Sequence, residues 1–128
     1  MKTKAEIMKV YTVGFDFEKM AIKTEVVEFE KENNNLKNYY NIIGCDTIDI
    51  VNLNEDIAIV VDDDGLLKSG TPVFEIKTED GAELQLAGKL LFAKNNYTND
   101  GTKLTGLTSG EIFNLMINLE IRVIGVTR

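Results

Sequence analysis

The first quarter of the chain alternates apolar and polar residues in two stretches. Residues 7–15 and 21–30 each place successive side chains on opposite sides, and the segment 16–19 separates them. Alternation with a period of two indicates β-strands, because successive side chains of a strand point to opposite faces of a sheet. The pattern therefore predicts a hairpin of two long strands that turns at residues 16–19.

Two other segments follow the period of a helix. Residues 36–43 repeat apolar side chains at helical spacing after a run of asparagines, and Gly44 is suited to end that helix. Thr108 and Glu111 form a capping-box pattern, which predicts a second helix over residues 109–119. The apolar residues expected together on one face of this helix are Ile112, Leu115, Met116 and Leu119.

The middle of the chain contains more strand patterns. Residues 47–53 and 57–62 are β-rich runs joined by a polar turn, which predicts a second hairpin. Residues 66–72 contain Gly70 and Pro72, so we expect an irregular connection there.

Alternation returns in residues 73–77, before an Asp80-Gly81 turn signal and the apolar run 90–93. Residues 95–106 are rich in asparagine and glycine and are expected to form a loop, whereas residues 121–128 read as a last strand. We therefore expect an α+β fold, a single domain over residues 1–128. Its expected architecture is one antiparallel or mixed sheet of about six or seven strands packed by two short helices.

Composition and charge narrow the classes of partner. Apolar residues make up 44% and charged residues 27% of the sequence, as in ordinary globular proteins. The net charge is −7, and the whole acidic excess lies in residues 1–64, where 14 acidic residues face 7 basic ones. Long nucleic acids need many phosphates to be neutralised, so no nucleic-acid partner is expected. The sequence lacks a secretory pattern and a membrane-spanning run, and the expected location is the cytoplasm.

The absence of histidine removes most catalytic and metal chemistry. With no histidine and one cysteine, Cys45, the chain offers no ligand set for structural zinc and no Ser-His-Asp or Cys-His group. Cys45 has no activating base and is expected to be a small buried residue. Neither a P-loop nor a dinucleotide-binding glycine motif is found. We expect no catalytic residue, no cofactor and no metal.

Three consecutive carboxylates, Asp62, Asp63 and Asp64, form the densest group of possible metal ligands. An EF-hand loop needs an oxygen ligand at its first position and a bidentate glutamate at its twelfth. With Gly65 at the sixth position, Val60 stands first and Thr71 twelfth, so both required ligands are missing. The favoured interpretation is a solvated turn after a buried strand. Weak Mg²⁺ or Ca²⁺ binding, and a metal-dependent enzyme built on these carboxylates, remain alternatives.

Residues 89–103 combine the side-chain types that suit a small anionic ligand. Phe92 and Tyr97 lie among amides and three lysines, and such residues can stack a base and hydrogen-bond a ribose or phosphate. The plainer interpretation is a core phenylalanine followed by a surface loop. Arg122 lies within an apolar strand, where a guanidinium usually has an assigned partner such as an internal carboxylate.

The segment "LKNYYNIIGCDTIDIVNLNEDIAIVVDDDGLL" carries a resemblance to known proteins. It resembles a domain-of-unknown-function family of phages and other mobile elements. The shared features are a short helix, a glycine-bearing turn, a hairpin with an acidic end followed by Gly-Leu, and the later strand 87–92. The matching region is about residues 36–116. This chain has Gly44-Cys45 where the family usually has two glycines, and an aspartate triplet where the family has asparagine or glutamate.

In size and layout the chain also resembles the phage Thoeris anti-defence proteins of the first type. The resemblance implies a sponge that sequesters cyclic ADP-ribose isomers without cleaving them, as a symmetric homo-oligomer, dimer or higher, in the host cell cytoplasm. It implies that Phe92 stacks on the adenine and that Asn95 or Asn99 and Arg122 meet the ribose and pyrophosphate, with Lys103 as a further contact.

Another function needs no pocket at all. An acidic phage-encoded protein could bind a host factor as an inhibitor or adaptor through the acidic first half of the chain, because such a role needs surface charge and no ligand cavity. The sequence therefore leaves two classes of binding protein, the nucleotide sponge and the protein-binding inhibitor or adaptor.

Overall fold

The structure is a computed structural model that describes residues 6–32, 34–78 and 80–128. In this part of the chain two α-helices and nine β-strands form two antiparallel sheets, so the predicted α+β class is confirmed. The first residues, expected to carry no leader sequence, lie partly outside the described residues. The strands are β1 (Ile7–Asp16), β2 (Ala21–Glu30), β3 (Ile48–Asn52), β4 (Ile57–Asp62), β5 (Pro72–Lys77), β6 (Glu83–Ala87), β7 (Leu90–Thr98), β8 (Gly101–Thr105) and β9 (Glu120–Val126). The helices are α1 (Leu36–Ile43) and α2 (Ser109–Asn118), with a short 3-10 helix at Gly65–Leu67.

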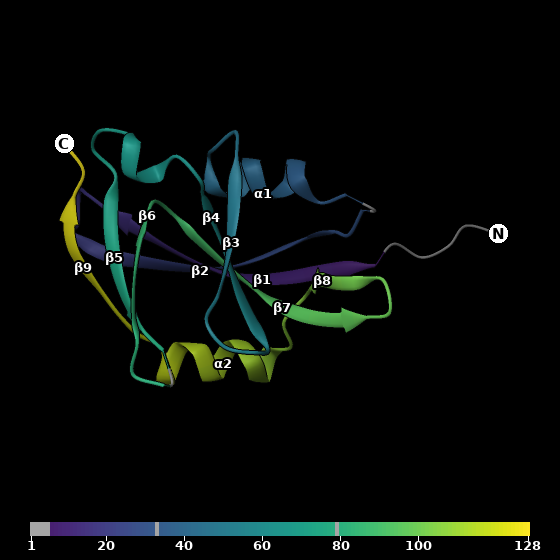
Figure 1. The fold of residues 1–128 in the computed structure, drawn as a ribbon. Helices are drawn as coiled ribbons and strands as arrows, with labels where there is room; N and C mark the ends of the chain where they lie inside the picture. The colour runs from purple at the N-terminus through teal and green to yellow at the C-terminus, as the bar shows by residue number, and fades with distance from the viewer. Residues whose placement is uncertain (1–5, 33, 79) are drawn as a thin grey trace.

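The larger sheet has the strand order β2-β1-β7-β4-β3, and β8 pairs with the far end of β7. The smaller sheet has the order β6-β5-β9. Figure 1 shows the small sheet at one end of the molecule and the β7–β8 hairpin at the other end. The strands thus divide between two sheets, whereas the sequence predicted one sheet of six or seven strands. Alternation identifies the apolar face of a strand, but it does not identify the sheet to which the strand belongs.

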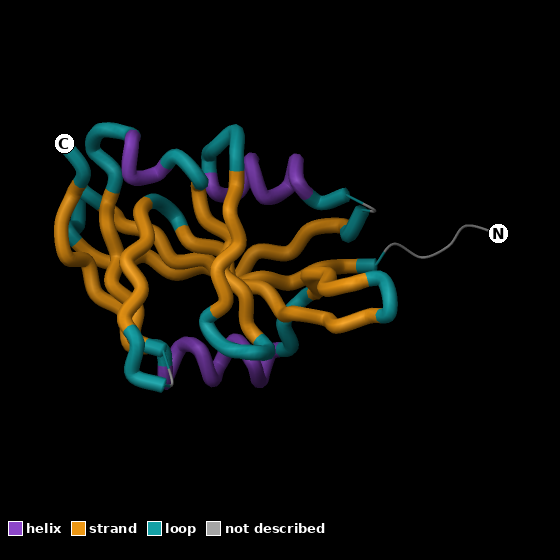
Figure 2. Tube along the Cα trace, in the orientation of Figure 1, coloured by secondary structure: helices purple, strands orange, loops and turns teal. Residues whose placement is uncertain are grey.

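Alternating residues of the large sheet fill two cores. In β1, Tyr11 and Val13 face the small sheet and α2, whereas Met8 and Val10 face α1. The same alternation continues in β4 and β7, so α1 and α2 lie on opposite faces of the large sheet, as Figure 2 shows. The fully buried side chains that fill both cores are mainly Phe74, Phe92, Met8, Ile59, Ile76, Leu90 and Leu91.

Local signals set the helix ends. Gly44 follows α1 with φ of 81°, a left-handed conformation that favours glycine, and its N–H donates to the carbonyl of Tyr40. At α2 the Thr108 hydroxyl accepts from the N–H of Glu111, and the Glu111 carboxylate accepts from the N–H of Thr108. Both predicted helices are therefore confirmed, the second ending at Asn118.

The segment expected to be a loop, residues 95–106, is instead mostly a hairpin. The second half of β7 continues beyond the residues that pair with β1 and β4, and it pairs with β8 across a turn at Asn99 and Asp100. Tyr97 lies opposite Thr102, an aromatic and β-branched pair that stabilises antiparallel strands. The loop prediction was wrong because cross-strand pairing outweighs the low strand propensity of asparagine and glycine.

No helix in residues 6–32, 34–78 or 80–128 has the length and apolar character needed to cross a bilayer.

Candidate functional site

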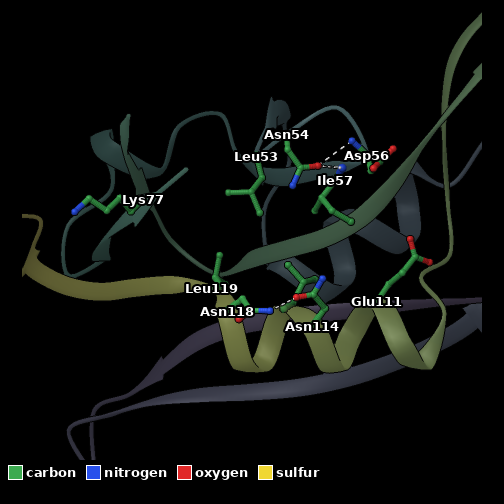
Figure 3. A pocket seen from close by; sticks show the side chains of 10 residues that line it. Leu53, Asn54, Asp56, Ile57, Lys77, Glu111, Asn114, Asn118 and Leu119 are labelled. Atoms are coloured by element: carbon green, nitrogen blue, oxygen red, sulfur yellow. Dashed lines mark hydrogen bonds between the residues drawn. The ribbon is translucent and has the colours of Figure 1, made fainter. Parts of the chain in front are cut away.

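A cavity of about 300 Å³ lies along one flank of α2 (Figure 3). The turn between β3 and β4 forms one wall, α2 forms the opposite wall, and the end of β5 closes one side. Its apolar floor consists of Leu53, Ile57, Leu115 and Leu119. Its polar walls carry Asn54, Asp56, Lys77, Glu111, Asn114 and Asn118. The volume is at the small end of the range for ligand pockets.

The β3–β4 turn is held by the side chain of Asn54. Its Oδ1 accepts hydrogen bonds from the N–H groups of Asp56 and Ile57, both at 2.8 Å, so the amide fixes the turn that forms the cavity wall. Asparagine favours such turns because its short side chain can mimic a backbone carbonyl. On the facing wall, Asn118 Nδ2 donates to Asn114 Oδ1 one helical turn earlier.

Glu111 brings a fixed negative charge to the same cavity. Its Oε1 accepts from the N–H of Thr108 at 2.9 Å, and its Oε2 lies 3.1 Å from Lys94 Nζ. Partial burial, the largest single influence, raises the pKa of Glu111, but the hydrogen bonds from Thr108 and Lys94 together outweigh it and hold the pKa below its ordinary value. The carboxylate is therefore ionised at neutral pH.

Asp56 is the carboxylate of this cavity that can meet a cationic group, because Glu111 is already paired with Lys94. Asp56 and Glu111 contribute two carboxylates to its lining, Lys77 contributes one ammonium group, and the ammonium group of Lys94 lies 3.1 Å from the Glu111 carboxylate. A phosphate placed between these carboxylates would meet like charge in a partly desolvated space, which weakens binding. A lysine or arginine side chain from a partner could instead pair with Asp56.

The side of α2 that faces away from the core is apolar. Phe113, Met116 and Ile117 are 63%, 58% and 62% exposed, and they lie three and four positions apart on one helix face. Sequence patterning placed Met116 with the core residues of α2, and this expectation was wrong because the core contacts of the helix are made by Ile112 and Leu115. Adjacent exposed apolar side chains mark a contact surface more often than scattered ones do.

Phe92 lies in the core, and the structure corrects the expectation that it stacks on a ligand. The residue has no exposed surface, and its ring lies 6.0 Å from the ring of Tyr11. It occupies the middle strand of three, with Tyr11 opposite on β1 and Ile59 opposite on β4. A ring buried in this way has no face to offer to a base.

Asn95 also has an internal role. It is 6% exposed, and its Nδ2 donates to Asn52 Oδ1 at 3.0 Å and to the carbonyl of Glu55 at 3.2 Å. These bonds join β7 to the β3–β4 hairpin. Asn95 therefore positions the turn beside the cavity.

The other three predicted site residues are exposed, but the fold separates them. Asn99 and Lys103 lie on the β7–β8 hairpin, whereas Arg122 lies on β9 at the opposite end of the molecule (Figure 1). The guanidinium of Arg122 donates to Glu75 Oε1 through Nε at 2.9 Å and through Nη2 at 2.6 Å. The carboxylate partner expected for Arg122 is thus present, and no single site unites it with Phe92, Asn95, Asn99 and Lys103.

The aspartate triplet turns the chain, as favoured from the sequence. Asp62 Oδ2 lies 2.6 Å from Lys68 Nζ, and Asp62 Oδ1 accepts from the N–H of Asp64 at 2.9 Å. Asp64 Oδ2 accepts from the hydroxyl of Thr47 at 3.2 Å. In the part of the chain that the structure describes, no group of three or more potential ligands is placed to hold a metal. Each of these contacts stabilises the turn into the 3-10 helix.

The polar residues of the α2 cavity are not among the site residues predicted from the sequence. Asn114 and Asn118 stand four positions apart between apolar residues, which is the only local sign that one flank of this helix differs from the rest. Asn54 and Asp56 belong to the polar turn predicted between residues 53 and 57, and the structure places them in that turn. Their nearness to α2 depends on contacts between elements far apart in the chain.

Comparison with known proteins supplies a family. A family model described as Domain of unknown function (DUF3846) matches residues 15–116. The matched region contains the β3–β4 turn and most of α2. No curated protein and no solved structure matches the chain.

Proposed function

The chain belongs to the family described as Domain of unknown function (DUF3846), and we propose that it acts by non-catalytic binding to a protein partner. The partner surface presents apolar side chains beside a lysine or arginine. As an inhibitor or adaptor, the chain would act by covering that surface. This proposal retains the protein-binding alternative reached from the acidic sequence.

The outward face of α2 is the observation that carries the proposal. Phe113, Met116 and Ile117 stay more than half exposed in the isolated chain, although each is large enough to stabilise a core. Covering them with a partner removes apolar surface from water, which is the main driving force of association. Aromatic side chains such as Phe113 are frequent anchors of such contacts.

The neighbouring charges select the kind of partner. Asn114 lies between this apolar face and the cavity, three positions before Ile117, so the two features adjoin on the helix surface. A partner that packs on the apolar face can extend a basic side chain toward Asp56. The overall net charge of −7 attracts a basic surface over longer range and repels acidic ones.

A nucleotide sponge is the second candidate, and one observation favours it. Three amide side chains, Asn54, Asn114 and Asn118, line the cavity, and amides can hydrogen-bond the edges of a base or the hydroxyls of a ribose. The phosphates of a cyclic ADP-ribose isomer would have to remain outside, away from the two carboxylates. The resemblance to Thoeris anti-defence proteins supports this proposal. With it we also propose a phage origin and a site in the host cytoplasm.

The protein-binding proposal is tested by comparing two variants that each remove an exposed apolar side chain. Phe113→Ser alters the α2 face, and Leu67→Ser alters the 3-10 helix, where the side chain is 85% exposed. Immobilised wild type, Phe113→Ser and Leu67→Ser are incubated with bacterial lysate, and retained proteins are quantified by mass spectrometry. We expect a protein retained by wild type and by Leu67→Ser to be lost from Phe113→Ser.

The retained protein is then purified and titrated against Asp56→Lys. We expect a weaker affinity, with a smaller salt dependence than for wild type, because a favourable charge has been reversed. Equal retention by Phe113→Ser and wild type would refute the α2 face as the binding surface.

The sponge is tested by calorimetry with purified cyclic ADP-ribose isomers, followed by release of the nucleotide on boiling and its identification by chromatography. Tight binding, with intact nucleotide recovered and with affinity lost in Asn114→Leu, would support the second candidate. Absence of heat would refute it, and altered nucleotide would show an enzyme.

A further inference from the structure

β2 has one free edge. It forms the end of the large sheet and, in the part of the chain that the structure describes, hydrogen-bonds along its length to β1 only. Every residue from Ala21 to Val26 is exposed. A long regular edge is a template for pairing with another strand. The residues 21–27 include Ile22, Thr24, Val26 and Val27, which are β-branched and favour strands.

The register with β1 shows which backbone groups face outward. Lys31 N–H donates to the carbonyl of Glu6, which makes these two residues a hydrogen-bonded pair. The β1–β2 register continues without a shift to Asp16 and Ala21, so the odd-numbered residues of β2 direct their N–H and C=O groups toward β1. The even-numbered residues direct theirs to the free edge: Ile22, Thr24, Val26, Glu28 and Glu30.

We propose that β2 is a homodimerisation strand that pairs antiparallel with β2 of a second copy about a two-fold axis at Thr24. This register joins outward-facing groups to outward-facing groups, with about six backbone hydrogen bonds between the copies. Ile22 of each copy lies opposite Val26 of the other. Lys23 of each copy lies opposite Glu25 of the other. The contact is self-complementary, as a two-fold interface requires.

Charge complementarity selects this register over its neighbours. A shift that centres the axis on Lys23 brings two lysines opposite each other, and a shift that centres it on Glu25 brings two glutamates together. An axis at Val26 places Lys23 opposite Phe29 and Ile22 opposite Glu30. Only the axis at Thr24 gives two apolar pairs and two opposite-charge pairs among these registers, and like charges directly opposite are destabilising.

The charged pairs lie at the close positions of the new ladder. Lys23 and Glu25 belong to non-hydrogen-bonded pairs there, in which side chains approach more closely than in hydrogen-bonded pairs. In the isolated chain Lys23 Nζ lies 3.6 Å from Glu25 Oε1 of the same strand, and both side chains are well exposed at 63% and 46%. Either side chain can therefore rotate toward the facing copy without breaking a buried ion pair. The contact is independent of the α2 face.

Two charge reversals test the register. Lys23→Glu places glutamates opposite Glu25, and Glu25→Lys places lysines opposite Lys23, so each variant alone should self-associate about tenfold more weakly than wild type. A mixture of the two variants restores opposite charges at both pairs, as does the double variant Lys23→Glu/Glu25→Lys. Lys19→Glu, outside the paired residues, carries the same change of net charge as Lys23→Glu and is the matched control.

Sedimentation velocity of the full chain from about 10 µM to about 1 mM measures association, since edge contacts of this size are typically weak. We expect dimers for wild type, Lys19→Glu, the double variant and the mixture, with each single reversal shifted to monomer. Circular dichroism confirms that each variant is folded.

Amide hydrogen exchange locates the contact. With rising concentration the amides of Ile22, Thr24 and Val26 should gain protection, whereas those of Lys23 and Glu25, already bonded to β1, should not change. A wild type that stays monomeric at every concentration would overturn the proposal. Single reversals that dimerise as well as wild type would also overturn it, because another surface would then hold the dimer.

Discussion

Replacing Phe92 tests whether this residue stabilises the core, as the structure indicates, or contacts a ligand, as the sequence resemblance implied. The side chain is fully buried in β7 and packs in the core between the two sheets. The residues opposite it, Tyr11 and Ile59, belong to strands hydrogen-bonded on either side of β7. Because these strands are hydrogen-bonded to β7, they can move little toward the space that a smaller side chain would leave, so truncation of Phe92 creates a cavity.

The structure sets the expected magnitudes. Phe92→Ala should lower the free energy of unfolding by about 3–5 kcal/mol, at the upper part of that range because the site cannot collapse. Since a small domain has a total of about 5–15 kcal/mol, this variant can fail to fold. Phe92→Leu keeps much of the volume and should cost about 1.5 kcal/mol, which corresponds to a decrease in melting temperature of about 5–10 °C.

Urea and thermal unfolding, followed by far-UV circular dichroism, measure these changes, and tyrosine fluorescence is a second probe because the sequence has no tryptophan. Asn96→Ala, on an exposed residue of the same strand, is the control and should stay within about 0.5 kcal/mol of wild type. An unchanged unfolding midpoint for Phe92→Leu would refute the core position. Loss of nucleotide binding without loss of stability would restore the stacking role.

Three further substitutions or measurements test other parts of the structure. Gly65→Ala should destabilise the fold by about 1–3 kcal/mol, because a Cβ there would lie 2.6 Å from the carbonyl oxygen of Ala87, whereas Gly110→Ala in α2 has space and should be neutral or stabilising; chemical denaturation compares the two. Glu111→Gln should reduce stability at neutral pH. The lowered pKa of Glu111 gives stability that is present above its unfolded pKa and is lost as pH falls through the folded pKa, so the denaturation curves of wild type and variant should converge in acid. Cys45 should react with iodoacetamide more slowly in the native chain than in urea, because its side chain is buried and because burial first and the nearby carboxylate of Asp62 second raise the pKa of its thiol. Equally fast labelling would contradict its buried position.

Local patterns predicted most elements of this fold. The capping box at Thr108, the glycine after α1 and the hairpins at residues 7–30 and 47–62 were all readable, because each depends on residues close in the sequence. The Asn99-Asp100-Gly101 turn is also a hairpin signal between β-branched residues, although the amide-rich composition around it favours a loop.

The candidate site was less predictable. The ligand role expected for Phe92 depended on the direction in which its ring points. Both faces of the central strand β7 are apolar, so the sequence pattern does not show which core or surface the ring faces. Arg122 pairs with the carboxylate of Glu75 on β5, a strand that is distant from Arg122 in the sequence. The cavity arises where the β3–β4 turn meets α2, a contact for which no sequence motif exists.

The sequence by itself determined the α+β class, the acidic character and the helix ends, since composition and short-range spacing are local properties. It also determined the lack of histidine-based chemistry, because no fold can supply a residue that the chain does not contain. The tertiary structure alone decided the division into two sheets, the burial of Phe92 and Asn95, and the exposure of Phe113, Met116 and Ile117. These features depend on which elements pack together, and that choice minimises exposed apolar surface over the whole chain. For the same reason β2 became an edge strand only when the sheet assembled with β1 inside it.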